Sequence, residues 1–194
     1  MKNLPKYIRL RNKTHLIFDF DGTLADLILD WSKWHLEVLE IIGKYDKEAV
    51  NFRGVVHYSR NDFLKRFGRV LKKDLDTHNE KYEAKMLSGY KANDYLVDFV
   101  KNNSEKYYQF LYTSNSRKTI LPIVEELEII DDFKKIITAD EVEYFKPHPF
   151  GFDLIYDPNI DKLHYLMIGD SKADSGVAKA AGIDYVDVTE IESR

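Results

Sequence analysis

The sequence predicts an α/β fold, a doubly wound parallel sheet that is interrupted by an inserted block of helices. Short apolar runs alternate with helical segments from about residue 90 onward. An earlier apolar run, residues 14–20, is separated from them by a long stretch of helical periodicity. Strands that alternate with helices favour a parallel sheet covered on both faces. We therefore expect a main domain of residues 1–25 and 89–194 and a helical cap domain of residues 26–88.

The first apolar run is expected to form a buried strand that ends in a turn at Gly22. A helical stripe with spacings of four and three follows and ends near Gly43; it comprises Leu27, Trp31, Trp34, Val38 and Ile41. The two tryptophans are expected in the core of the cap domain. We expect one further helix capped by Asn61 and another over residues 74–86. No strand is expected between residues 26 and 88.

The second half of the chain predicts the rest of the sheet. Strands are expected at residues 107–114, 134–140, 163–170 and 183–188. Helices are expected between them, from Asn93 through Val100, over residues 117–127, and over residues 171–182, where Gly182 ends the helix. This order again alternates strand with helix.

Composition limits the class of protein and its partners. The 194 residues carry a formal charge of −4 and include no cysteine. An acidic chain has no general attraction to nucleic acid or to an anionic membrane, and the lack of cysteine excludes disulfides and thiolate ligands. No signal-peptide pattern and no long apolar span is visible. We expect a cytoplasmic protein, a monomer or weak dimer, with no nucleic-acid or membrane partner.

Polar side chains follow the predicted strands, at the edge where ligands bind in parallel α/β sheets. The candidates are Asp19 and Asp21 after the first strand, Thr113, Ser114 and Asn115 after the second, Lys146 after the third, and Asp170 and Asp174 after the fourth. Carboxylates that crowd together repel one another, and a hard cation with oxygen ligands relieves that repulsion. Mg²⁺, together with a lysine, suits phosphoryl transfer.

The spacing of the first two aspartates suggests a division of labour. Asp19 and Asp21 are two residues apart, so in an extended chain both side chains point the same way. One carboxylate can attack phosphorus while the other handles the proton of the leaving group. Gly22 allows a sharp turn directly beyond them.

Four segments in order resemble the signatures of the haloacid dehalogenase-like (HAD) superfamily. They are DFDGTL at residues 19–24, LYTSN at 111–115, KPHP at 146–149 and IGDSKAD at 168–174. An insertion between the first two signatures is similar to the helical-cap subgroup, which includes phosphoglycolate phosphatase-like and β-phosphoglucomutase-like enzymes. The resemblance implies a Rossmann-like HAD core and a Mg²⁺-dependent phosphatase acting on a small phosphorylated metabolite.

The resemblance also implies roles for single residues. Asp19 would form an aspartyl-phosphate, and Asp21 would act as general acid and then as general base. Ser114 and Asn115 would bind the phosphoryl group near Gly22, and Lys146 would hold its charge beside Asp19. Mg²⁺ would be bound by Asp19, Asp170 and the backbone carbonyl of Asp21, with Asp174 as a further ligand or as support for the metal site.

Each of these signals also has a simpler interpretation. A calcium loop starting at Asp19 fails, because its sixth and twelfth positions hold Leu24 and Asp30. Lys146 alone could be a solvated surface lysine, Ser114 alone could cap the next helix, and Asp174 could be a first-turn acid. We expect Ser116 to cap that helix, which leaves Ser114 for the phosphoryl group. The histidines show no ligand spacing, so no zinc site is predicted. Asp21 favours phosphate esters, because the dehalogenases of the superfamily carry a non-acidic residue there.

A basic stretch of the cap leaves an open question. Arg53 and Arg60 either belong to a solvated helix face or bind an anionic part of the substrate. Two other functions also remain open. A β-phosphoglucomutase-like mutase would return the phosphoryl group to a sugar, and turnover that requires a bisphosphate primer would reveal it. A binding or regulatory module on the same scaffold would retain the fold without Mg²⁺ binding or phosphatase activity.

Overall fold

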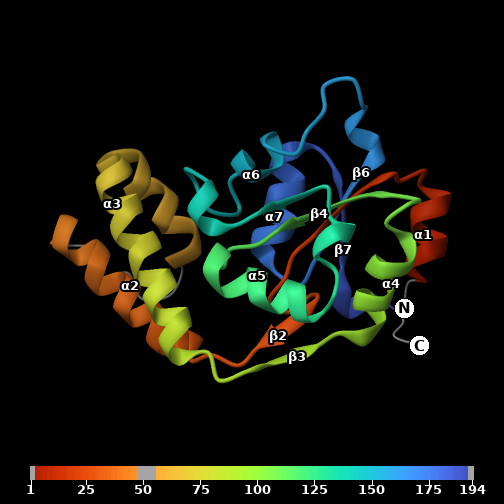
Figure 1. Cartoon of the computed structure of the whole chain (residues 1–194). Helices are drawn as coiled ribbons and strands as arrows, with labels where there is room; N and C mark the ends of the chain where they lie inside the picture. The colour runs from red at the N-terminus through yellow and green to blue at the C-terminus, as the bar shows by residue number, and fades with distance from the viewer. Residues whose placement is uncertain (1–2, 48–55, 192–194) are drawn as a thin grey trace.

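The computed structural model describes residues 3–47 and 56–191 and contains the predicted parallel sheet (Figure 1). Its five strands lie in the order β5-β4-β1-β6-β7, and all of them are parallel. Their bounds are β1 His15–Phe18, β4 Tyr108–Tyr112, β5 Lys135–Ile137, β6 Tyr165–Gly169 and β7 Asp184–Asp187. The predicted doubly wound α/β class is thus confirmed, with strands somewhat shorter than the apolar runs.

Both faces of the sheet are buried, because successive β1 residues belong to different hydrophobic clusters. Leu16 and Phe18 pack with α1 Leu4–Leu10, α4 Asp94–Asn103 and α5 Arg117–Glu126. Ile17 packs with α6 Phe150–Asp153 and α7 Lys172–Ala181. Alternate residues of a strand point to opposite faces, so a fully apolar strand requires this double cover.

The ends of these helices follow the expected local chemistry. The side chain of Asn93 caps α4 by accepting a hydrogen bond from the Leu96 N–H, and Gly182 ends α7 with φ 73°. The helix α1 was not predicted. Short 3₁₀ segments complete the described elements, at Ile130–Asp132, Ala139–Glu141, Lys162–His164 and Val188–Glu190.

Two long helices lie beside the sheet domain, α2 Trp31–Tyr45 and α3 Val56–Met86, and they pack against each other (Figure 1). Trp34 is buried between them and donates from Nε1 to Asn79 Oδ1 at 2.8 Å. The prediction that Trp34 belongs to the core of this block is therefore confirmed. The division into a core and a cap domain stays a prediction.

Three expectations for this block were wrong: the absence of a strand, the helical stripe from Leu27 and the helix cap at Asn61. The strands β2 Ala25–Leu27 and β3 Tyr90–Ala92 form a two-stranded antiparallel sheet, which joins the block of helices to the rest of the chain. Leu27 therefore begins no helix. Asp30 caps α2 instead, accepting from the Lys33 N–H. Asn61 lies inside α3 rather than at its start. The helix expected over residues 74–86 is present as the later part of α3, which non-helical backbone at Gly68, with φ 60°, divides into two helices.

Within residues 3–47 and 56–191, no helix combines the length and the apolar character needed to cross a lipid bilayer.

Candidate active site

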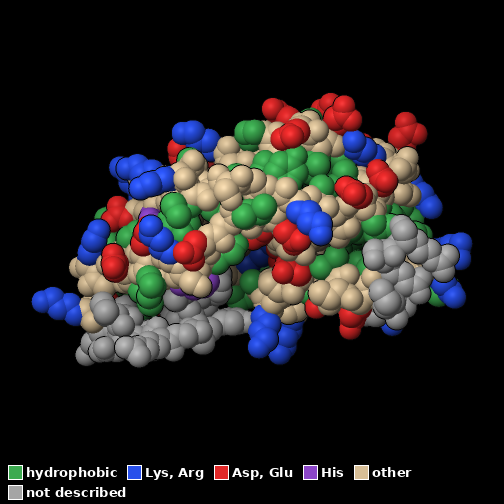
Figure 2. All heavy atoms as spheres, turned by 90° about the horizontal axis from the view of Figure 1, so that it is seen from below, with side chains coloured by type: hydrophobic (Ala, Val, Ile, Leu, Met, Phe, Trp, Pro, Cys, Tyr) green, Lys and Arg blue, Asp and Glu red, His purple; other side chains and the backbone are tan. Residues whose placement is uncertain are grey.

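Carboxylates gather at the carboxyl edge of the sheet, where β1 and β6 end. Oxygen atoms of Asp19, Asp170 and Asp174 all lie within 4.8 Å of one another. Asp19 directly follows β1, Asp170 directly follows β6, and Asp174 lies in the first turn of α7. The convergence expected from the order of the strands is present for these three residues. Figure 2 views the molecule from below Figure 1 and shows acidic side chains beside a hollow near the middle of that face.

A buried lysine joins two of these carboxylates. Lys146 Nζ lies 2.8 Å from Asp19 Oδ1 and 2.7 Å from Asp174 Oδ1, and its ammonium also lies over the Tyr112 ring at 4.8 Å. The lysine is only 2% exposed. Burial by itself disfavours the ammonium, but the Asp174 and Asp19 carboxylates outweigh it and raise the pKa of Lys146. Lys146 is therefore not the solvated surface lysine of the simpler interpretation.

The pKa of Asp19 is shifted because its carboxyl group is buried among charged side chains. Burial raises the pKa of Asp19 well above its ordinary value, and the Asp174 carboxylate raises it further, while Lys146 opposes both. Asp19 Oδ1 also accepts a hydrogen bond from the Phe20 N–H at 2.7 Å. A buried carboxylate held by one ammonium and one backbone N–H has a fixed orientation, which is what a nucleophile requires.

Asp21 lies shortly after β1, which ends at Phe18. Asp21 Oδ1 accepts from the Leu27 N–H at 2.7 Å, which directs this carboxylate toward β2. Burial raises the pKa of Asp21 to about 6. A carboxyl group with that pKa can both donate and accept a proton near neutral pH.

Asp174 is held on both of its oxygens. Oδ1 accepts from Lys146, and Oδ2 accepts from Ser171 Oγ at 2.5 Å and from the Ser171 N–H at 3.2 Å. Ser171 in turn accepts from the Asp174 N–H, so the pair forms a capping box at the start of α7. Asp174 is fully buried, whereas Asp170 is exposed. Through these contacts Asp174 holds Lys146 and the segment that follows β6 in place.

The loop after β4 places Ser114 at intermediate exposure and buries its neighbour Asn115. The Asn115 N–H donates to Thr113 Oγ1, and its side-chain amide donates to Glu83 Oε1. The donors of Asn115 expected to assist the phosphoryl group thus make contacts within the protein. Ser116 occupies the expected N-cap position of α5, but the expectation that its side chain caps the helix was wrong, because its Oγ donates to Glu83 Oε2 instead.

The two arginines suspected of substrate binding differ in outcome. Arg53 lies outside the described residues. Arg60 is 2% exposed, and its guanidinium lies 4.5 Å from the Phe145 ring and 5.0 Å from the Trp34 ring. Burial lowers the pKa of Arg60 to about 10. Arg60 is therefore neither part of a solvated helix face nor directed toward solvent; it packs at the junction between the inserted helices and the segment that precedes Lys146.

Asn61 makes a second contact at that junction, which sequence reasoning missed. Its side chain donates to the Phe145 carbonyl at 2.7 Å and accepts from the Phe145 N–H at 2.9 Å. Both hydrogen bonds are buried and join residues 84 positions apart. No local pattern could reveal such a contact. It fixes the backbone of the residue immediately before Lys146.

We expect Asn61→Ala to lower the free energy of unfolding by about 2 to 3 kcal/mol, because it leaves a buried N–H and a buried carbonyl without partners. Urea unfolding with an unchanged m-value measures the loss. The matched control is Asn102→Ala on the exposed surface of α4, where we expect a change within about 0.5 kcal/mol. Equal effects of the two substitutions would contradict a special role for the Asn61 contact.

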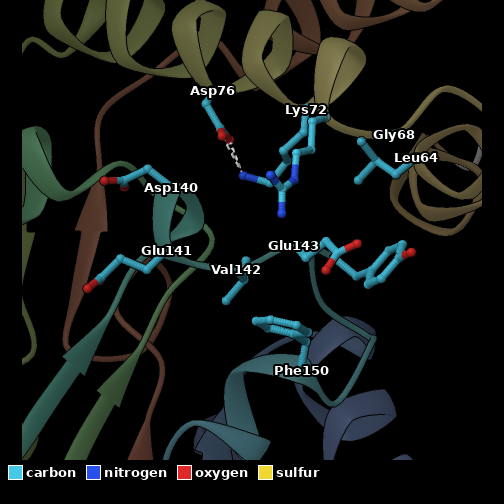
Figure 3. Close-up of a pocket in the computed structure, with 11 residues that line it drawn as sticks. Leu64, Gly68, Lys72, Asp76, Asp140, Glu141, Val142, Glu143 and Phe150 are labelled. Carbon is cyan, nitrogen blue, oxygen red and sulfur yellow. Dashed lines mark hydrogen bonds and ion pairs between the residues drawn. The ribbon is translucent and has the colours of Figure 1, made fainter.

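A pocket of about 270 Å³ lies apart from the acidic cluster, between α3 and residues 140–144 with Phe150. Figure 3 shows Asp76 turned toward Lys72 across its upper side, where Lys72 Nζ lies 2.6 Å from Asp76 Oδ1. Lys72 also donates to the Ala139 carbonyl at 3.0 Å. None of the three clustered aspartates lines this pocket. We therefore place the candidate active site at the sheet edge and not here.

Comparison with known proteins gives consistent matches. The haloacid dehalogenase-like hydrolase family matches residues 16–188. A phosphoglycolate phosphatase from Vibrio vulnificus is 26% identical over 190 residues, covering 86% of this chain and 79% of that relative.

Solved structures share the fold. A protein from Bacteroides fragilis assigned to the haloacid dehalogenase-like hydrolases aligns with TM-score 0.63 and 20% identity, covering 94% of this chain and 90% of its own. YfnB from Bacillus subtilis, in an orthorhombic form bound to magnesium, aligns with TM-score 0.53 and 18% identity, with the same coverage of 94% and 90%.

Proposed function

Since the chain belongs to the haloacid dehalogenase-like hydrolase family and is an enzyme, we propose that it is a magnesium-dependent phosphatase that hydrolyses a small phosphomonoester through an aspartyl-phosphate. The observation that carries this proposal is the buried lysine between two carboxylates at the sheet edge, Lys146 between Asp19 and Asp174. A cation fixed there can balance the charge that a phosphoryl group brings to Asp19.

In the first step, a carboxylate oxygen of Asp19 attacks phosphorus and the ester oxygen leaves. The carboxyl group of Asp21 gives its proton to that leaving oxygen. The raised pKa of Asp21, about 6 through burial, supports this role, because about a tenth of the groups are then protonated at pH 7, far more than for an ordinary aspartate. The Leu27 N–H donates to Asp21 Oδ1 and so holds this carboxyl group in a fixed position.

In the second step, Asp21 is a carboxylate and takes a proton from water. The water oxygen attacks phosphorus of the aspartyl-phosphate, the bond to Asp19 breaks, and inorganic phosphate leaves with Asp19 restored. Ser114 and Lys146 are proposed to hold the phosphoryl oxygens in both steps. Ser114 lies at intermediate exposure beside the buried Asn115, so its hydroxyl is the accessible donor of that loop.

The donor set fits a magnesium ion. Asp19 and Asp170 offer hard carboxylate oxygens close together, and Asp170 is the exposed member of the cluster. We propose that these two carboxylates and the Asp21 carbonyl hold the ion, with Asp174 as support. The bound ion would offset negative charge on the phosphoryl group. The magnesium bound to the structurally similar YfnB supports this choice of metal.

A small acid or sugar phosphate is the proposed substrate class. The relative from Vibrio vulnificus is a phosphoglycolate phosphatase, and the two long helices α2 and α3 stand beside the sheet, where they can cover a small ligand. A panel of 2-phosphoglycolate, hexose phosphates and nucleoside monophosphates tests this class. We expect hydrolysis of at least one small member with Mg²⁺, loss of activity with EDTA, and recovery when Mg²⁺ is restored. Activity that persists in EDTA would contradict the metal dependence.

We expect Gly22→Ala to reduce kcat/KM by about 10- to 100-fold, because a new Cβ would lie 2.3 Å from Asp170 Oδ2 and would displace that carboxylate. The backbone at Gly22 also has φ 76°, which strains any other residue. Kinetics across a range of Mg²⁺ concentrations measure the effect, with a higher half-saturating concentration expected.

The matched control for Gly22→Ala is Gly182→Ala. Gly182 has φ 73°, but no heavy atom lies within 4 Å of its added Cβ. This variant should lose a comparable amount of stability through backbone strain and retain its kcat/KM. Equal loss of activity in both variants would show that strain, and not contact with Asp170, controls the result.

A further inference from the structure

Glu83 of α3 is a buried carboxylate that the proposed chemistry does not use. It is 1% exposed, and it accepts three hydrogen bonds from the loop that follows β4. Asn115 Nδ2 donates to Oε1 at 3.1 Å, while the N–H and the Oγ of Ser116 donate to Oε2 at 3.0 and 2.6 Å. The helices α3 and α5, which flank this contact, lie side by side (Figure 1).

The contact requires an acceptor on both side-chain oxygens. The side-chain NH₂ group of Asn115 and the Ser116 N–H can only donate, and Ser116 Oγ has Thr119 Oγ1 as its other neighbour at 2.9 Å. A carboxylate satisfies all of these donors together, whereas an amide of the same shape would turn its NH₂ group toward one of them. No salt bridge to Glu83 is present in the described part of the chain, so these hydrogen bonds stabilise its buried charge.

Glu83 also takes the place of a local helix cap. Ser116 occupies the N-cap position of α5 but makes no capping hydrogen bond with its side chain. The carboxylate from α3 accepts the Ser116 N–H instead, and it lies at the positive end of the α5 dipole. An element that lies 32 residues away in the sequence therefore sets the direction in which the chain leaves β4 and enters α5.

The consequence concerns Ser114, which directly precedes the two residues held by Glu83. Asn115 is held on one side by Thr113 and on the other by Glu83, so the loop cannot rotate without breaking buried hydrogen bonds. We propose that Glu83 is a positioning residue that fixes the loop of Ser114 and Asn115 for binding the phosphoryl group. This inference rests on the proposed phosphatase function and adds the inserted helix α3 to the phosphoryl site.

Glu83→Gln tests the inference, with Glu80→Gln as the matched control. Glu80 lies one turn earlier on α3, is half exposed, and pairs with Lys118 of α5 at 2.7 Å. The probes are inhibition by orthovanadate with Mg²⁺ present, kcat and KM for p-nitrophenyl phosphate, and the Mg²⁺ concentration for half-maximal rate. We expect Glu83→Gln to weaken vanadate inhibition and lower kcat/KM by about 10- to 100-fold. The Mg²⁺ concentration for half-maximal rate should change less than about threefold, because the proposed metal ligands follow β1 and β6 and not β4. Glu80→Gln should match wild type.

Ser116→Ala is the second variant, because it removes only one of the three donors and preserves the charge of Glu83. We expect this variant to lose less vanadate affinity, about 3- to 10-fold. If Glu83→Gln does not fold, the vanadate affinity of Ser116→Ala tests the positioning role instead. Vanadate inhibition equal to that of Glu80→Gln, or vanadate and Mg²⁺ affinities falling in parallel, would overturn the positioning role. A wild-type enzyme without vanadate-sensitive hydrolysis would instead overturn the proposed function itself, and with it this inference.

Discussion

Asp19→Asn is expected to abolish metal-dependent hydrolysis of p-nitrophenyl phosphate, with kcat reduced by at least about 1,000-fold. An amide has no nucleophilic oxygen anion, so the aspartyl-phosphate cannot form. The fold should persist. The asparagine oxygen can still accept from the Phe20 N–H, and Lys146 keeps the Asp174 carboxylate as its partner. Steady-state kinetics with Mg²⁺, together with circular dichroism, measure both points.

The matched control is Asp98→Asn, which makes the same chemical change on the exposed surface of α4. It should retain kcat within about twofold, since surface substitutions away from special features have small effects. If Asp19→Asn retained wild-type activity in a folded protein, the nucleophile would have been assigned to the wrong residue.

Asp21→Asn should separate the two chemical steps when p-nitrophenyl phosphate is the substrate. The nitrophenolate leaves without needing a proton, so phosphorylation of Asp19 can proceed without a general acid. Hydrolysis of the aspartyl-phosphate needs the carboxylate as base and should slow by about 100- to 10,000-fold. Stopped-flow absorbance should then show a burst of nitrophenol equal to the enzyme concentration, followed by slow turnover.

An alkyl phosphate provides the comparison, because its alkoxide must be protonated as it leaves. With that substrate, Asp21→Asn should show neither burst nor turnover. A variant that turns over both substrates at one uniformly reduced rate would argue that Asp21 only supports the metal site. The backbone carbonyl of Asp21, which is the group proposed to bind the ion, is present in both proteins.

The sheet could be predicted from the sequence because β1 and β6 are fully buried apolar runs that are followed directly by aspartate. The two apolar faces of β1 required helices on both sides, and this fixed the class of fold. The β2–β3 pair could not be predicted, since its three-residue strands are too short for a recognisable pattern and are separated by residues 28–89. The interruption at Gly68 also escaped prediction, because helical periodicity continues on both sides of it.

Within the site, prediction reached residues at strand ends and missed those that act from a distance. Asp19, Asp170 and Asp174 converge because parallel strands place their carboxyl ends together. The hydrogen bond from the Leu27 N–H to Asp21 was not predicted, since it depends on the path of the chain after β1. Asn61 and Glu83 were missed because their partners are 84 and 32 residues away. Only the tertiary structure brings these pairs together.

The most direct test of the central claim is to locate the covalent intermediate. Asp21→Asn is mixed with p-nitrophenyl phosphate and Mg²⁺, quenched with acid during the burst, and digested for mass spectrometry. We predict one added phosphoryl group on the peptide that contains Asp19, which hydroxylamine removes as expected for an acyl phosphate. A phosphoryl group on Ser114 or His148, or a full burst without any covalent adduct, would contradict Asp19 as the nucleophile.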